Sequence, residues 1–83
     1  MTGLGPKNPR VQRLRRLLGR RSARSEEGCF VVEGAVLVNE SVEAGWEIEA
    51  QYVAPGGVPV ATPTGGHVFE LVEGVIERVA STE

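Results

Sequence analysis

Three short apolar segments limit how this chain of 83 residues can fold, because each lies too far from the next for a tight hairpin. They occupy residues 29–32, 48–53 and 67–71, and their β-branched and aromatic residues are typical of strands. Strands joined by long connections pair in parallel through crossovers. The spacing therefore predicts a small, mostly parallel sheet.

Helical patterns precede, separate and follow these strands. Pro9 suits the first turn of a helix with Asn8 as its N-cap, and Gly19 marks the end of that helix. A second helix is predicted over residues 35–44, with Gly45 as its C-cap, and a last helix follows the third strand. The residues expected to face the core are Val11, Leu14, Leu17 and Leu18 in the first helix, Ala35, Val38 and Val42 in the second, and Val72, Val75, Ile76 and Val79 in the last.

This order of elements predicts an α/β fold with three layers, α/β/α, around a small, mostly parallel sheet. We expect residues 1–8 to be a flexible lead and residues 9–83 to form one domain. The stretch 54–66 is rich in proline and glycine, so we expect a loop in which residues 58–61 are briefly extended. The sequence has no apolar run long enough to span a membrane and no signal-peptide core. We therefore expect a cytoplasmic chain without a membrane partner.

Positive charge is confined almost entirely to one part of the chain. Residues 1–25 hold seven arginines, one lysine and no acidic residue, whereas residues 26–83 hold Arg78 and eleven glutamates. A helical wheel places Arg13, Arg16 and Arg20 opposite the apolar stripe, so we expect a row that faces solvent. Such a block is either a solvated helix face or a surface for a polyanion, and the planar guanidinium group suits phosphate.

Self-contained catalysis is not expected. The chain has no aspartate, one cysteine, one histidine and no serine in a nucleophile-elbow context. We interpret Cys29 as a small core residue rather than a nucleophile, and His67 as a half-exposed structural residue rather than an acid or base. A lone cysteine excludes an internal disulfide. Because the chain has only one cysteine and one histidine, we expect no structural metal site.

Three further residues leave two interpretations open. Glu33 either complements the dipole of the helix that follows it or lies beside backbone amides that contact a phosphate or a base edge. Trp46 and Tyr52 are candidates for stacking on a nucleobase. Trp46 could equally cover the end of the helix that Gly45 caps.

An ordered set of motifs covers most of the chain. The residues Arg24, Gly28, Phe30, Glu33 and Gly34 fit the pattern Arg-x-x-x-Gly-x-Phe-x-x-Glu-Gly. Before it, Asn8-Pro9-Arg10-Val11 leads into Leu14 and Leu17-Leu18, and after it comes Glu43-Ala44-Gly45. This set resembles the N-terminal substrate-binding domain of the SpoU/TrmH-family RNA 2′-O-ribose methyltransferases.

The resemblance implies a fold like that of the kink-turn-binding ribosomal proteins and a role in holding ribosomal or transfer RNA for methylation. In the family, a separate C-terminal SPOUT domain binds S-adenosylmethionine, in part through a Ser-Leu-Asn motif that does not occur in this sequence. The resemblance therefore implies no cofactor in this chain and S-adenosylmethionine in the catalytic domain. The partners that it implies are RNA and that catalytic domain, with the full-length protein a homodimer.

The leading hypothesis is thus an RNA-binding, substrate-recognition domain whose arginines contact phosphates. The residues expected in this role are Arg10, Arg13, Arg16, Arg20, Arg21 and Arg24. The alternative is a protein-interaction or dimerisation module whose arginine-rich helix binds an acidic partner. A stand-alone enzyme ranks third, because no constellation of catalytic residues supports it.

Overall fold

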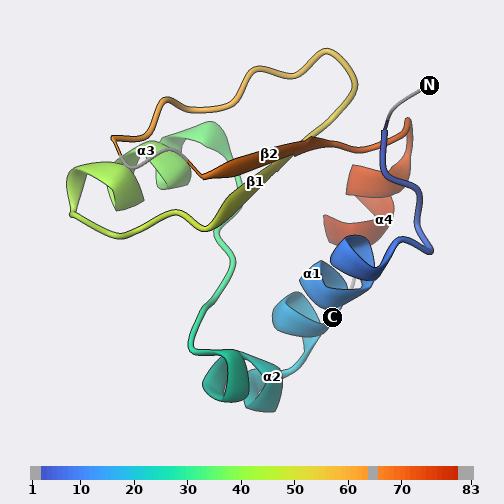
Figure 1. The fold of residues 1–83 in the computed structure, drawn as a ribbon, viewed down its shortest axis with the longest axis horizontal. Coiled ribbons are helices and arrows are strands. Elements are labelled where there is room, and N and C mark those ends of the chain that lie inside the picture. The colour runs from blue at the N-terminus through green and yellow to red at the C-terminus, as the bar shows by residue number, and fades with distance from the viewer. Residues whose placement is uncertain (1–2, 64–65, 81–83) are drawn as a thin grey trace.

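The computed structural model describes residues 3–63 and 66–80. In these ranges, helices α1 (Pro9–Gly19), α2 (Arg21–Glu27) and α3 (Ala35–Glu43) precede strands β1 (Ala50–Val53) and β2 (His67–Glu70) and helix α4 (Val75–Ala80). Helix α3 lies near the start of the two strands, whereas α1 and α4 lie near their ends (Figure 1). The combination of these helices with a parallel sheet confirms a small α/β domain.

The two strands pair in parallel, as their spacing predicts. Ala50 lies opposite His67, and Val53 lies opposite Glu70. The connection between them has no helix or strand in its described residues, which include 58–61. Val60 nevertheless fixes this loop to β1, because its N–H donates to the side-chain oxygen of Gln51 at 2.9 Å and its carbonyl accepts from the side-chain amide at 2.7 Å.

The first described residues are tied to the sheet, which differs from the flexible lead expected over residues 1–8. Leu4 bridges to Leu71 in parallel. The Leu4 N–H donates to the carbonyl of Glu70 at 2.7 Å, and the Leu4 carbonyl accepts from the Val72 N–H at 3.0 Å. The Leu4 side chain also packs against the core. Residues 1–2 of the expected lead lie outside the described residues.

Helix α1 begins as its sequence predicts. The side-chain oxygen of Asn8 accepts a hydrogen bond from the Arg10 N–H at 2.9 Å, and Pro9 occupies the first turn, where an N–H would have no partner within the helix. The predicted apolar stripe is confirmed, with Val11, Leu14 and Leu17 buried and Leu18 half-buried.

The core lies between α1, α4 and the residue that follows β2. Val11 and Leu71 are fully buried there and are joined by Leu14, Val75 and Val79. Full burial of a valine or leucine side chain contributes about 1.5–3 kcal/mol, so this small cluster accounts for much of what holds α1 in place. By fixing one face of α1, the core determines that the opposite face points outward.

The prediction of a strand over residues 29–32 is wrong. These residues form no backbone hydrogen bond of a sheet with any described residue, and neighbouring side chains contact different parts of the fold. Val31 packs against the core, whereas Phe30 points away and contacts Trp46. A cavity of about 600 Å³ separates this segment from β1, where a third strand would have to pair.

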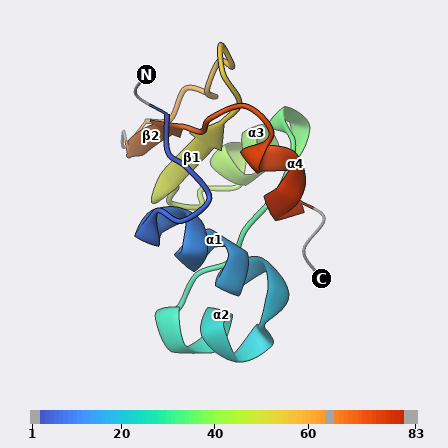
Figure 2. The same ribbon diagram turned by 90° about the vertical axis from the view of Figure 1, so that its right-hand side faces the viewer.

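Helix α2 has no apolar periodicity in the sequence, and the pattern does not predict it. Of its seven residues only Ala23 is buried. It ends at Gly28, whose φ of 69° is the left-handed conformation that a glycine adopts at little cost after a helix. Figure 2 shows α1 and α2 together at one end of the molecule, with α2 farthest from the strands.

Helix α3 forms where the sequence predicts it, but it buries less than expected. None of its side chains is fully buried, Ala35 is exposed, and Val38 and Val42 are only half-buried. Val36 and Leu37 are exposed on its surface. In the described part of the chain, no helix has the length and apolar character needed to cross a membrane.

Candidate functional site

Four exposed arginines follow one another along the chain from α1 into the start of α2. Arg15 and Arg16 lie on α1, Arg20 joins the two helices, and Arg21 begins α2. Among the described residues, Arg16 alone of these four forms an ion pair, with Glu27 at 3.6 Å. We call Arg15, Arg16, Arg20 and Arg21 the arginine surface. It confirms the outward orientation predicted for Arg16 and Arg20.

Arg13 does not belong to this surface, and the prediction that it faces solvent is wrong. Its Nε donates to Glu27 at 2.5 Å, and its Nη1 donates to Glu49 at 2.6 Å. A third contact joins Nη2 to the sulfur of Cys29 at 3.4 Å. These partners come from α2, from the segment after it and from the residue before β1, so Arg13 fastens α1 to three parts of the fold.

The contacts of Arg13 shift the pKa of Arg13 itself and that of Glu27. Hydrogen bonds to Glu49 and Glu27 raise the pKa of Arg13 above its ordinary value. The hydrogen bond from Arg13 lowers the pKa of Glu27 below the ordinary value of a glutamate. Both shifts favour the charged forms, as expected for an ion pair between these side chains.

Arg24 is also engaged within the fold. Its Nη1 donates to the carbonyl of Leu17 at 2.7 Å and to that of Leu18 at 3.3 Å. These carbonyls lie in the last turn of α1, where backbone acceptors lack partners inside the helix. Arg24, the residue that opens the sequence motif, thus caps α1 from α2.

Arg10 lies at the start of α1, away from the junction with α2. Its guanidinium carbon is 4.8 Å from the centre of the Phe69 ring, which is a cation–π contact. Phe69 in turn lies 5.5 Å from Tyr52 and 5.9 Å from His67 between ring centres. Desolvation raises the pKa of Tyr52, which is half-buried between this cluster and the core. His67 is exposed rather than half-exposed.

Trp46 and Phe30 form an exposed aromatic pair. Their ring centres are 5.3 Å apart and their planes are nearly perpendicular, at 88°. Together with Arg21 and Arg24 they line a shallow depression that is wide open to solvent. We call this the aromatic groove, and its remaining lining residues are Ser25, Gly28 and Cys29.

The motif pair Glu33-Gly34 leads into α3. Gly34 has φ 92° and ψ 144°, a conformation that side-chain-bearing residues rarely adopt, and it occupies the N-cap position without a side-chain hydrogen bond. Glu33 is exposed and forms no hydrogen bond or ion pair with the described residues.

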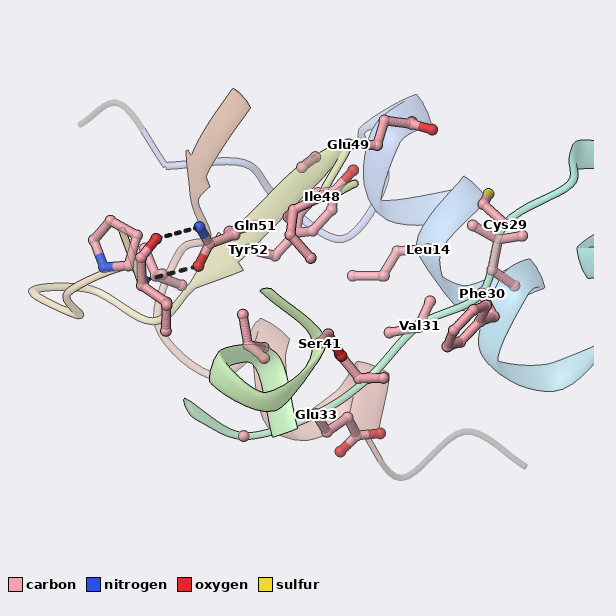
Figure 3. Close-up of a pocket in the computed structure, with 18 of the residues that line it drawn as sticks. Leu14, Cys29, Phe30, Val31, Glu33, Ser41, Ile48, Glu49, Gln51 and Tyr52 are labelled. Atoms are coloured by element: carbon pink, nitrogen blue, oxygen red, sulfur yellow. Dashed lines mark hydrogen bonds between the residues drawn. The ribbon is translucent and has the colours of Figure 1, made fainter. Parts of the chain in front are cut away.

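The larger cavity, of about 600 Å³, lies between α1, α3 and β1 (Figure 3). Leu14, Val31 and Ile48 line it, and the hydrogen bonds between Gln51 and Val60 close one end. Cys29 is half-buried at its margin. In the described ranges, no group of three or more histidine, cysteine or acidic side chains is placed to hold a metal ion.

Two residues of these sites escaped the sequence reasoning. Arg15 lies beside the apolar stripe on a helical wheel, yet a long arginine side chain can carry its charged end outward from such a position. Phe30 belongs to the apolar segment 29–32, whose composition suggests burial, although alternation along an extended segment places neighbours on opposite sides. In both cases the sequence contains the feature that allows the side chain to reach solvent.

Comparison with known proteins identifies the domain. The family model of the MRM3-like substrate binding domain matches residues 8–83, nearly the whole chain. The comparison with curated proteins gives no match. No solved structure matches either. Since this match covers residues 8–83, the chain belongs to the MRM3-like substrate binding domain family, a substrate-binding domain of the SpoU/TrmH type of RNA methyltransferases.

Proposed function

We propose that this domain holds an RNA substrate through the arginine surface and presents it to the catalytic domain of a 2′-O-ribose methyltransferase. The substrate in this proposal is a ribosomal or transfer RNA. Membership of the chain in the MRM3-like substrate binding domain family supports the binding of an RNA substrate. The exposure of four arginines between the middle of α1 and the start of α2 is the observation that carries the proposal.

Arginine is well matched to this task. Its planar guanidinium group donates paired hydrogen bonds to phosphate oxygens, and contacts to phosphates set the register and orientation of a nucleic acid. Arg15, Arg20 and Arg21 form no ion pair with a described residue, so binding a phosphate would not require an existing contact to break. Arg13 and Arg24 differ, since both are held by bonds within the fold.

The proposal assigns no cofactor to this chain. S-adenosylmethionine would supply the methyl group in the catalytic domain, where the family carries its Ser-Leu-Asn motif. The present sequence lacks that motif. The role proposed for this chain is therefore to bind and orient the RNA. A cytoplasmic location and a homodimer of the full protein belong to the same proposal.

The test is binding of a fluorescently labelled RNA stem-loop, measured by anisotropy over a series of salt concentrations. If about four phosphates are neutralised on single-stranded parts, log K should fall with log salt at a slope of roughly −3. The variant Arg15→Gln/Arg16→Gln/Arg20→Gln should bind more weakly and show a shallower slope. The control Arg78→Gln makes the same chemical change on α4 and should leave the slope unchanged.

Two results would contradict the proposal. One is a slope near zero, and the other is equal binding by the triple variant while circular dichroism shows that it remains folded. The alternative hypothesis, an interaction module for an acidic partner or for dimerisation, predicts a different observation. It requires self-association that depends on salt, seen by sedimentation without RNA.

A further inference from the structure

The aromatic groove is an unusual surface for so small a domain. Phe30 is 53% exposed and Trp46 is 60% exposed, and neither belongs to the core cluster or its surrounding shell. Leaving large rings in water forgoes the stabilisation that burying them would bring, about 25 cal/mol for each Å² of apolar area. The two side chains contact each other instead of the core.

The geometry of the pair leaves ring faces open. In an edge-to-face pair, the edge of one ring meets one face of the other, so most ring faces are not covered by the pair itself. An aromatic ring with an open face is the group on which single-stranded nucleic acids stack their bases, whatever the sequence. The exposure of Phe30 and Trp46 leaves such faces within reach of a flat ligand.

The charge in the groove points to an anionic ligand. Arg21 and Arg24 line it, and no carboxylate is among its lining residues in the described part of the chain. Arg24 is held in place by the carbonyls of Leu17 and Leu18, so its charge is fixed beside the rings. Arg21 is exposed and belongs also to the arginine surface, which makes the two features continuous. A neutral apolar partner would gain nothing from these charges.

We propose that the aromatic groove binds one unpaired nucleobase of an RNA strand, together with the phosphate next to it. The base stacks on Trp46 or Phe30, and Arg21 contacts the phosphate. This inference rests on the proposed function and extends it, because it makes the domain prefer RNA with unpaired bases over a continuous duplex. In a duplex the faces of the bases are already stacked and cannot reach the groove.

The chain offers its own reporter for the test. Trp46 is its single tryptophan, so stacking of a base on this ring should quench the intrinsic fluorescence directly. The first probe is a short single-stranded oligouridylate. The second is an oligomer of the same length in which every base is missing, so that it keeps the sugar-phosphate charges but cannot stack. The third is a duplex RNA of matched charge.

We expect the oligouridylate to bind about tenfold more tightly than the baseless oligomer, as the loss of one stacked base predicts. It should also quench Trp46, whereas the baseless oligomer should not. In the variant Phe30→Leu/Trp46→Leu, labelled forms of the two oligomers should bind equally. The control Leu37→Ala removes a comparably exposed apolar side chain from α3 and should keep the tenfold difference.

The outcomes separate the inference from the proposed function. If both oligomers bind the unmodified chain equally, RNA binds through its sugar-phosphate backbone and not through a base in the aromatic groove, which overturns the inference alone. If neither oligomer nor the duplex binds, both proposals fail. The comparison of oligomers needs no substitution, so it decides between these outcomes even where a variant fails to fold.

Discussion

Arg13 and Glu49 lie 36 positions apart in the sequence, yet Nη1 of Arg13 is 2.6 Å from a carboxylate oxygen of Glu49. The same guanidinium contacts Glu27 at the end of α2. Arg13 thus uses its charge to hold the fold together, although it stands in the most basic part of the chain. This division between arginines that hold the structure and arginines that face outward leads to separate predictions for stability and for binding.

Replacing Arg13 by glutamine should destabilise the domain. The change removes hydrogen bonds to two carboxylates, and because the side chains are partly exposed we expect a loss of about 1 kcal/mol in the free energy of unfolding. Urea denaturation followed by circular dichroism measures this. The matched variant Arg20→Gln should stay within about 0.5 kcal/mol of the unmodified chain. An equal loss in both variants would show that Arg13 has no special structural role.

Stability should fall in acid because of Glu27. Its folded-state pKa is lowered by Arg13, so its contribution is fully present above the unfolded value of about 4.3. That contribution disappears as the pH falls through the lower folded value. Urea midpoints measured between neutral pH and about pH 3 should therefore decline less steeply in Glu27→Gln. Glu40→Gln, an identical change on α3, should keep the full decline. Matching curves for both variants would contradict the assignment.

Leu71 should be among the least replaceable residues. It is fully buried in the core, and its backbone pairs with Leu4. We expect Leu71→Ala to cost about 2–5 kcal/mol, because it removes buried methyl groups and leaves a cavity. Val36→Ala, on the exposed face of α3, should change stability by less than about 0.5 kcal/mol. Thermal melts measure this. If Val36→Ala lowered the melting temperature more than Leu71→Ala did, the core would have to lie elsewhere.

Gly34 should resist substitution for reasons of backbone conformation alone. Its φ is 92°, and an added Cβ would meet no atom within 4 Å. Gly34→Ala should therefore cost about 1–3 kcal/mol through strain and not through a clash. Gly5 also has open space around it and lacks a positive φ, so Gly5→Ala is the matched control and should be nearly neutral. Denaturant midpoints that were equal for both alanine variants would argue against strain at Gly34.

Local patterns predicted the elements whose causes are local. The cap formed by Asn8 and the stripe from Val11 to Leu17 specify α1, and the parallel pairing of β1 with β2 follows from their separation. The strand expected over residues 29–32 failed because pairing depends on where a partner edge lies, which composition does not encode. Helix α2 was missed because it buries a single alanine and ends at Gly28, with no apolar period to reveal it.

The residues of the candidate site also divide into those whose orientation the sequence predicts and those whose contacts it does not. That arginines would face outward from α1 was readable from the wheel, and Arg16 and Arg20 do so. The sequence could not show which arginines are held by contacts within the fold. The partner of Arg13 is Glu49, far along the chain, and the partners of Arg24 are backbone carbonyls. The contact of Phe30 with Trp46 is likewise a product of tertiary structure.

The packing of α1 against Leu71 and α4 also bears on when the chain folds during its synthesis. Val11 and Leu14 find their core partners among Leu71, Val75 and Val79, near the opposite end of the described residues. During vectorial synthesis, α1 emerges from the ribosome long before those partners exist. Contacts of such high sequence separation slow folding, because the loop between them must close first. The most basic segment of the chain is therefore fixed in place late, when the region around Leu71 has been synthesised.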